Sequence, residues 1–202
     1  MKRIFNIILF ALFCTSFAQA QGGKTFEFTY KGQTLKYEVA NGNEAMVIEQ
    51  QSAKISGDVK IPESVTFAGK KYSVTSIGVS AFADCTGLTS VTIPNSVTSI
   101  EGFAFSHCYG LTSIIIPNSV TSIGEFAFDG CAITSITIEN ATPPDVEDFA
   151  FEEVSENITI YVPAESVEEY KTAEGWSEYA DKIEAIEKIN FNENINYNEE
   201  DF

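Results

Sequence analysis

A motif of 23 residues occurs three times in succession, and this repetition restricts the possible folds of the chain more than any other feature. The first copy, VTSIGVSAFADCTGLTSVTIPNS, covers residues 74–96, and the second covers residues 97–119 with the same spacing. The third, residues 120–142, has one residue fewer between its cysteine and the leucine or isoleucine that follows. A repeat of roughly 20 to 30 residues is typical of a solenoid, in which each copy forms one coil and packs on its neighbours.

Certain positions of the motif hold the same apolar residue in every copy, at steps of 23 residues. A weaker fourth copy, residues 143–163, continues these columns with Val146, Phe151 and Val154. Stacked coils would place equivalent side chains on top of one another and form one continuous core. The predicted core columns are Ile77, Ile100 and Ile123; Phe82, Phe105, Phe128 and Phe151; and Cys85, Cys108 and Cys131.

A single copy is not expected to fold alone. It offers about eight inward apolar side chains, and each large one contributes about 1.5 to 3 kcal/mol when buried. Ordering the backbone costs about 1 to 2 kcal/mol per residue over the whole copy. Stacking offsets this cost, because neighbouring coils share a core and add hydrogen bonds between their backbones.

Each copy also predicts its own secondary structure. The apolar residues Leu88, Val91 and Ile93, set among β-branched residues, predict a short strand over residues 88–93, which Pro94 ends because proline lacks a backbone N–H donor. Residues 74–77 predict a second strand on the opposite wall. The spacing of Phe82 and Cys85 predicts one helical turn between the strands, closed by a glycine. The expected fold is therefore mainly β, with two narrow sheets and about four coils.

The order S-I-G-x-x-A-F-x-x-C-x-G-L-T-S-V-x-I-P-x-S-V resembles the BspA-like leucine-rich repeat, which occurs in secreted and surface proteins of Bacteroidetes and of some parasitic protists. The similarity is close over residues 74–142. The segments GDVKIPESV before the repeats and VPAESVEEYKTAEGW after them resemble the usual entry and exit segments of that family. The resemblance implies a right-handed solenoid that is exported to the cell surface and used for adhesion or contact with host proteins.

Residues 1–20 have the parts of a secretory signal. Lys2 and Arg3 precede an apolar run, and an A-x-A site predicts cleavage near Ala20. The mature chain would have no transmembrane segment, because the run is too short for a permanent anchor and no other window approaches the needed length. The alternative is that Cys14 carries a lipid. We expect an exported protein at the cell surface, in the periplasm or outside the cell.

The segments that flank the repeats are expected to cover the ends of the solenoid, since a terminal coil would otherwise expose its core. Residues 21–53 predict an N-terminal β-hairpin cap with a possible third strand. The solenoid is assigned to residues 54–163 and includes a loop projecting around Gly69. Residues 164–189 predict a C-terminal helical cap, with Trp176 facing inward, and residues 190–202 an acidic mobile tail.

The chain is strongly acidic, with a net charge of −17. From Glu139 onward it holds 19 acidic residues and only three lysines. Such a chain repels phosphates, which excludes nucleic acid as an expected partner. The acidic end is interpreted as a solvated surface that prevents solenoids from stacking end to end. The alternative, cation binding, lacks the spacing of a calcium loop.

No residue pattern indicates catalysis, a cofactor or a metal site. The three cysteines of the repeats are interpreted as small buried apolar residues, because parallel Cβ directions disfavour a disulfide and no zinc-binding spacing occurs. His107 is the only histidine and takes a loop position. It is expected to point away from Cys108, so the two would not form a nucleophile and base pair.

The leading hypothesis is a non-enzymatic binding module that contacts a host or matrix protein through an outer wall of the solenoid. Residues 74–138 contain no lysine or arginine, so binding there should depend only weakly on salt. The alternatives are recognition of a polysaccharide and a structural spacer of the cell envelope. The oligomeric state is left open. The candidate ligand-facing columns are Thr75, Thr98 and Thr121, and Thr89, Thr112 and Thr134.

Overall fold

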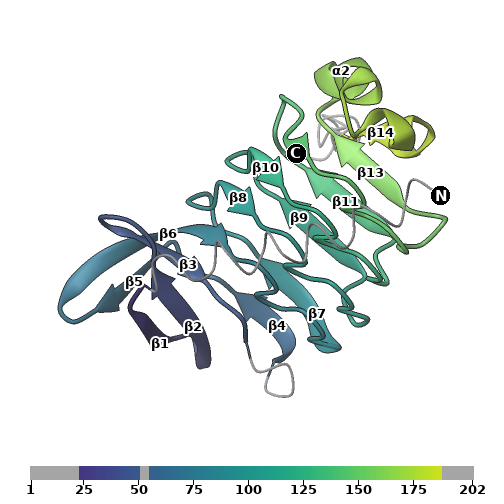
Figure 1. Ribbon diagram of the computed structural model, residues 1–202. Helices are drawn as coiled ribbons and strands as arrows, with labels where there is room; N and C mark the ends of the chain where they lie inside the picture. Colours follow the sequence, from purple (N-terminus) through teal and green to yellow (C-terminus); the bar gives the residue numbers. More distant parts are fainter. Residues whose placement is uncertain (1–22, 51–54, 188–202) are drawn as a thin grey trace, which may run out of the picture.

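Each copy of the repeat contributes one strand to each of two walls, and apolar residues of both walls meet between them. The computed structural model describes residues 23–50 and 55–187, and Figure 1 shows the coils stacked side by side from β6 to β13. The fold is mainly β, as predicted, and forms a repeat solenoid. The predicted signal sequence and the predicted acidic tail lie outside the described residues.

The first wall is one eight-stranded sheet. Its short repeat strands pair in parallel and in register, so that Ile77, Ile100, Ile123 and Val146 are neighbours. Three strands extend the sheet at its N-terminal side, and one further strand pairs with β6. Its strands are β1 (Thr25–Tyr30), β2 (Gln33–Val39), β3 (Glu44–Val47), β5 (Ser64–Phe67), β6 (Lys70–Ile77), β8 (Ser99–Ile100), β10 (Ser122–Ile123) and β12 (Asp145–Val146).

The second wall consists of two separate parallel sheets. The two-stranded sheet pairs β4 (Ser56–Lys60) with β7 (Gly87–Thr92). The four-stranded sheet contains β9 (Ser113–Ile116), β11 (Ser135–Ile138), β13 (Thr159–Val162) and β14 (Ile183–Ala185). β9, β11 and β13 alternate between buried residues and residues that face away from the core. In β7 the core residues Leu88 and Val91 are separated by two residues outside the core, at the point where the register of its pairing with β4 shifts.

A column of stacked phenylalanines occupies the core between the walls. The ring centroids of Phe82 and Phe105 are 5.3 Å apart with an interplanar angle of 6°. Phe105 and Phe128 repeat this arrangement at 5.3 Å and 5°, and Phe128 and Phe151 at 5.5 Å and 5°. The isoleucine and cysteine columns are also buried. The step of 23 residues in the sequence thus corresponds to one coil of the stack.

The predicted helical turn at Ala81–Cys85 is wrong. This segment and its counterparts form irregular turns, because two residues four positions apart adopt left-handed backbone conformations in every coil. In the first coil these are Ser80 (φ 53°) and Asp84 (φ 57°). Left-handed residues interrupt a right-handed helix. The turns make isolated local hydrogen bonds, such as the one from the Cys85 N–H to the Phe82 carbonyl oxygen at 3.0 Å. They also bond to the next coil, for example from the Phe82 N–H to the Ala104 carbonyl oxygen at 2.7 Å.

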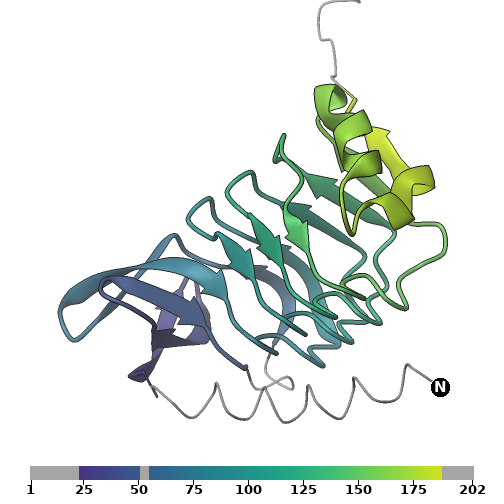
Figure 2. The same cartoon turned by 45° about the horizontal axis from the view of Figure 1, so that its top comes forward.

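The projection predicted around Gly69 is present, but it is a β-hairpin and not a loop. Residues 64–77 form an antiparallel hairpin of β5 and β6 that turns at Ala68 and Gly69. Both turn residues have positive φ angles, 49° and 78°, as tight hairpin turns require. Figure 2 shows this hairpin extending beyond the N-terminal end of the coils.

Beyond the repeats, the chain adds helices in the region expected to be helical and one strand that the sequence did not predict. The 3-10 helix η2 (Ala164–Ser166) and the helix α2 (Val167–Thr172) lie where helical structure is expected, and η3 (Ser177–Lys182) follows. The strand β14 then joins β13 in parallel, so this region is not purely helical. Trp176 is fully buried, and its indole N–H donates a hydrogen bond to the Pro144 carbonyl oxygen at 2.7 Å.

Candidate functional site

The two predicted threonine columns lie on different walls. Thr75, Thr98 and Thr121 belong to the coils of the first wall, and hydrogen bonds join Thr98 and Thr121 to the preceding coil. Thr112 and Thr134 belong to the coils of the second wall, where the Thr134 N–H donates to the Thr112 carbonyl oxygen. Thr89 lies in β7, which belongs to the separate two-stranded sheet. The structure therefore does not bring the six threonines together on one surface.

Most of these hydroxyl groups already make hydrogen bonds within the protein. Thr98 Oγ1 donates to the Thr75 carbonyl oxygen and Thr121 Oγ1 to that of Thr98, both at 3.2 Å. Thr89 Oγ1 donates to Asp58 Oδ1 at 3.2 Å. A hydroxyl proton that serves the backbone of the previous coil is not free for a ligand, although the oxygen can still accept. The threonines therefore contribute to the stacking of coils.

The outward face of β9, β11 and β13 carries Ile115 and Tyr161, which the sequence analysis did not single out. Ile115 is 57% exposed, and Thr137 pairs with Ile115 on one side and with Tyr161 on the other. The adjacent outward row consists of Ser113, Ser135 and Thr159. We call these six residues the wall patch. Its signal in the sequence was the alternation within each strand, which marks Ile115 as facing solvent.

A shallow depression adjoins the wall patch at its C-terminal side. It has a volume of about 510 Å³ and is lined by Thr137, Tyr161 and residues 184–187. Hydroxyl groups and two carboxylates surround it, so it presents hydrogen-bond acceptors beside an aromatic ring.

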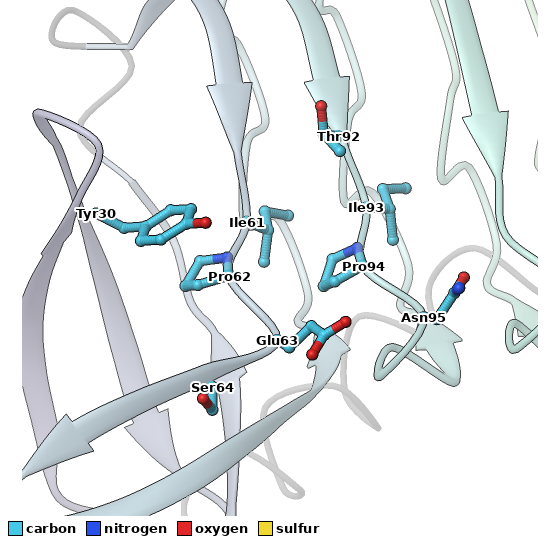
Figure 3. A pocket seen from close by; sticks show the side chains of 9 residues that line it. All are labelled: Tyr30, Ile61, Pro62, Glu63, Ser64, Thr92, Ile93, Pro94 and Asn95. Atoms are coloured by element: carbon cyan, nitrogen blue, oxygen red, sulfur yellow. The ribbon is translucent and has the colours of Figure 1, made fainter.

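A second depression lies between the N-terminal hairpin and the coils. Its volume is about 520 Å³, and Figure 3 shows Tyr30 beside Pro62 of one coil, with Pro94 on the next. Ile61 and Ile93 lie at its base and are nearly fully buried. Glu63 is the one carboxylate among its lining residues. The lining offers apolar contact and no nucleophile and base pair.

His107 lies between two carboxylates on adjacent coils. Its Nδ1 is 3.7 Å from Asp84 Oδ1, and its Nε2 is 3.7 Å from Asp129 Oδ2. Ser106 Oγ lies 3.3 Å from Nδ1, but Ser106 is only 3% exposed. A nucleophile must reach its substrate, and this residue is buried. Within residues 23–50 and 55–187, no group of three or more side chains is placed to hold a metal ion.

The thiol groups of the repeats are buried and unpaired with one another by disulfides. Cys108 Sγ donates to the Phe82 carbonyl oxygen at 3.1 Å, and Cys131 Sγ to that of Phe105 at 3.0 Å. Burial, followed by the nearby charge of Asp84, raises the pKa of Cys85 to about 11. The Cys85 thiol is therefore protonated at neutral pH, and the thiols of Cys108 and Cys131 link neighbouring coils. Cys108 points into the core, away from a partnership with His107.

Comparison with known proteins identifies the repeats. The family described as the BspA type leucine rich repeat region matches six copies over residues 75–202. No curated protein is significantly similar to the chain. None of the helices in the described residues is long and apolar enough to cross a membrane.

Two solved structures illustrate the similarity. A leucine-rich repeat protein from Bacteroides capillosus ATCC 29799 is 28% identical with a TM-score of 0.58, over 67% of this chain and 97% of that one. A leucine rich cell surface protein from Faecalibacterium prausnitzii A2-165 is 23% identical with a TM-score of 0.47, over 70% of this chain and 40% of that one.

Proposed function

The chain belongs to the BspA-type leucine-rich repeat family, and from this premise we propose that it is an exported, non-enzymatic binding protein. Its partner is a host or matrix protein, contacted through the wall patch. Export requires the predicted signal sequence of residues 1–20, with cleavage near Ala20. The resulting location is the cell surface or the medium around the cell.

The composition and rigidity of the wall patch carry this proposal. Its six side chains comprise four hydroxyl groups, one isoleucine and one tyrosine, without a charged group. Tyrosine is enriched in protein interfaces, and charged residues are depleted at their centres. The three strands are held in register by the ladder, so binding would order few backbone groups. The wall is thus suited to a flat protein surface.

The terminal segments support the same function by covering the ends of the solenoid. We propose that the β1–β2 hairpin is the N-terminal cap and that α2, η3 and β14 form the C-terminal cap of a right-handed stack. Trp176 packs against Phe151 with ring centroids 5.7 Å apart, and against Tyr170 at 5.3 Å. Closed ends keep the coils from associating with one another through their cores.

Binding to immobilised matrix proteins tests the proposal. Residues 21–202 are passed over a panel of such proteins, and at least one is expected to bind saturably. The variant Ile115→Ser/Tyr161→Ala should weaken that binding by roughly tenfold or more, because it removes the apolar centre of the patch. Thr98→Ala, on the other wall, is the matched control. Absence of saturable binding, or equal binding by the wall variant, would refute the proposal.

Salt dependence gives a second measurement of the same contact. Because the wall patch has no charged side chain, its affinity should change little up to about 0.5 M salt.

A carbohydrate partner is the second candidate, favoured by the hydroxyl groups of the wall patch and by the carboxylates beside Tyr161. A glycan array distinguishes the two. Binding to glycans but not to proteins would support polysaccharide recognition. Binding to neither would support a structural spacer.

A further inference from the structure

A second apolar surface lies on the turns, away from the wall patch. The rings of Phe103 and Phe126 stack with centroids 5.1 Å apart at 19°, and those of Phe126 and Phe149 stack 5.2 Å apart at 14°. The core phenylalanines two positions later are fully enclosed, but Phe103 is 36% and Phe149 50% exposed. We call Phe103, Phe126 and Phe149 the phenylalanine ladder.

The turns themselves do not require phenylalanine at these positions. The three residues have φ angles of 59°, 56° and 61°, in the left-handed region that is unfavourable for bulky side chains. Ser80 holds the equivalent position of the first coil, and its φ is 53°. Serine therefore suffices for the same turn. The exposed rings are better explained by contact with another molecule.

Carboxylates border the phenylalanine ladder. Glu125 and Asp148 directly precede Phe126 and Phe149 in the chain. Glu147 Oε2 accepts a hydrogen bond from the Glu125 N–H at 3.0 Å. Partial burial, and then the negative charges of Glu147 and Asp148, raise the pKa of Glu125. The carboxylate of Glu125 is therefore close enough to Glu147 and Asp148 to be repelled by both, next to Phe126 and Phe149 in the chain.

These negative charges have no basic residue near them in the sequence. The stretch between Lys71 and Lys171 contains fourteen aspartate and glutamate residues and neither lysine nor arginine. Over the described ranges, the ion pairs made by lysine involve Glu168 and Asp181, both in the C-terminal helices. A cationic partner would therefore meet uncompensated charge at the phenylalanine ladder.

The arrangement of the rings narrows the choice of partner. Their faces cover one another, so a sugar could stack flat only at the two ends of the row. The carboxylates would be repelled by an anionic lipid surface. Aliphatic side chains can pack on the exposed ring edges, and lysine or arginine can reach the neighbouring carboxylates. A protein segment with both kinds of side chain satisfies both features.

We propose that the phenylalanine ladder, with Glu125, Glu147 and Asp148, binds a basic segment of a partner protein in which apolar residues alternate with lysine or arginine. This inference rests on the proposed role in protein binding and deepens it by naming the chemistry of a partner. It uses a surface separate from the wall patch, so either contact can fail without the other.

Calorimetric titration of residues 21–202 with synthetic peptides tests the inference. The probe alternates leucine with lysine; two matched peptides replace leucine by serine or lysine by glutamate. Only the leucine and lysine peptide should bind well, and the affinity should fall as salt rises to about 0.5 M. Failure of this peptide to bind, equal binding of the glutamate peptide, or preferential binding to phosphatidylserine vesicles would overturn the proposal.

Two variants locate the contact. Phe103→Ser/Phe126→Ser/Phe149→Ser copies the serine of the first coil and should weaken binding by roughly tenfold or more. Tyr109→Ser is the control, because it removes an aromatic residue that is 58% exposed but lies outside the ladder. If the triple variant does not fold, a charge variant provides the test: Glu125→Gln/Glu147→Gln/Asp148→Asn. This variant should lower both the affinity for the peptide and the salt dependence of that affinity. Parental affinity in that charge variant, or in a folded triple variant, would refute the inference. Matrix-protein binding would remain an independent result.

Discussion

The Tyr170 hydroxyl donates a hydrogen bond of 2.7 Å to the Asn140 carbonyl oxygen, 30 residues earlier in the chain, and so ties α2 to the end of the third repeat. Tyr37 is equally inaccessible, but its hydroxyl has no hydrogen-bond partner among the described residues. A buried hydroxyl without a partner loses its bonds to water and gains nothing in return. The two tyrosines are therefore equally buried and differ in whether the hydroxyl group has a hydrogen-bond partner.

We expect opposite effects when each of these tyrosines is replaced by phenylalanine. Tyr37→Phe should raise the free energy of unfolding by about 1 kcal/mol, because it removes an unpaired polar group and keeps the ring. Tyr170→Phe should lower it by about 1 to 2 kcal/mol, because the Asn140 carbonyl loses its donor. Urea unfolding followed by circular dichroism measures both. A loss of stability in Tyr37→Phe would show that its hydroxyl is hydrogen-bonded in solution.

The buried phenylalanine column should be the most sensitive part of the core. Phe105 stacks between Phe82 and Phe128, so Phe105→Ala would leave a cavity with rings on both sides. We expect a loss of about 3 to 5 kcal/mol in the free energy of unfolding. Phe103→Ser, two positions earlier and partly exposed, is the control and should cost about 1 kcal/mol or less. Similar losses in the two variants would contradict the assignment of Phe105 to the shared core.

Most of the solenoid could be predicted because its core residues recur at the same positions of every copy. The invariant phenylalanines fixed the repeat length, and the alternation around Val91 fixed the strands of the second wall. The turns could not be assigned in the same way. The spacing of Ala81, Phe82 and Cys85 suits a helical turn, whereas the left-handed conformation of Ser80 and Asp84 is set by bonds to the next coil.

Features that depend on contacts between distant segments were also missed. The strand β14 exists because residues 183–185 pair with β13, and no repeat pattern marks this segment. The internal hydrogen bonds of Thr98 and Thr121 depend on the distance between coils, which sequence spacing does not give. Phe103, Phe126 and Phe149 hold equivalent positions in successive copies, but the exposure of Phe103 and Phe149 becomes evident only from the geometry of the turn.

Close packing of adjacent turns makes Gly124 sensitive to any side chain. A Cβ atom at this position would lie 2.5 Å from the Gly102 nitrogen and 2.8 Å from the Glu101 carbonyl carbon. Both are backbone atoms and cannot move without shifting the coil, so Gly124→Ala should cost about 1 to 3 kcal/mol. Gly102→Ala is the control, because its Cβ would meet the Glu125 carbonyl oxygen at 3.2 Å. The urea midpoints should fall more for Gly124→Ala, and equal midpoints would contradict this packing.

The thiols of the cysteine column should not react with a disulfide reagent until the protein unfolds. Cys85, Cys108 and Cys131 are buried, and the thiols of Cys108 and Cys131 donate to carbonyl oxygens of the preceding coil. Because the pKa of Cys85 is raised to about 11, little of the reactive thiolate exists at pH 8. Native residues 21–202 should therefore react with a disulfide reagent at none of the three positions, and unfolding in guanidinium chloride should expose all three. Rapid labelling of the native protein would show that the coils open locally, and fewer than three thiols after unfolding without reductant would reveal a disulfide.

Cys108→Ser places a hydroxyl in the same site, where it can donate to the Phe82 carbonyl, and should keep the fold while lowering the number of thiols released to two.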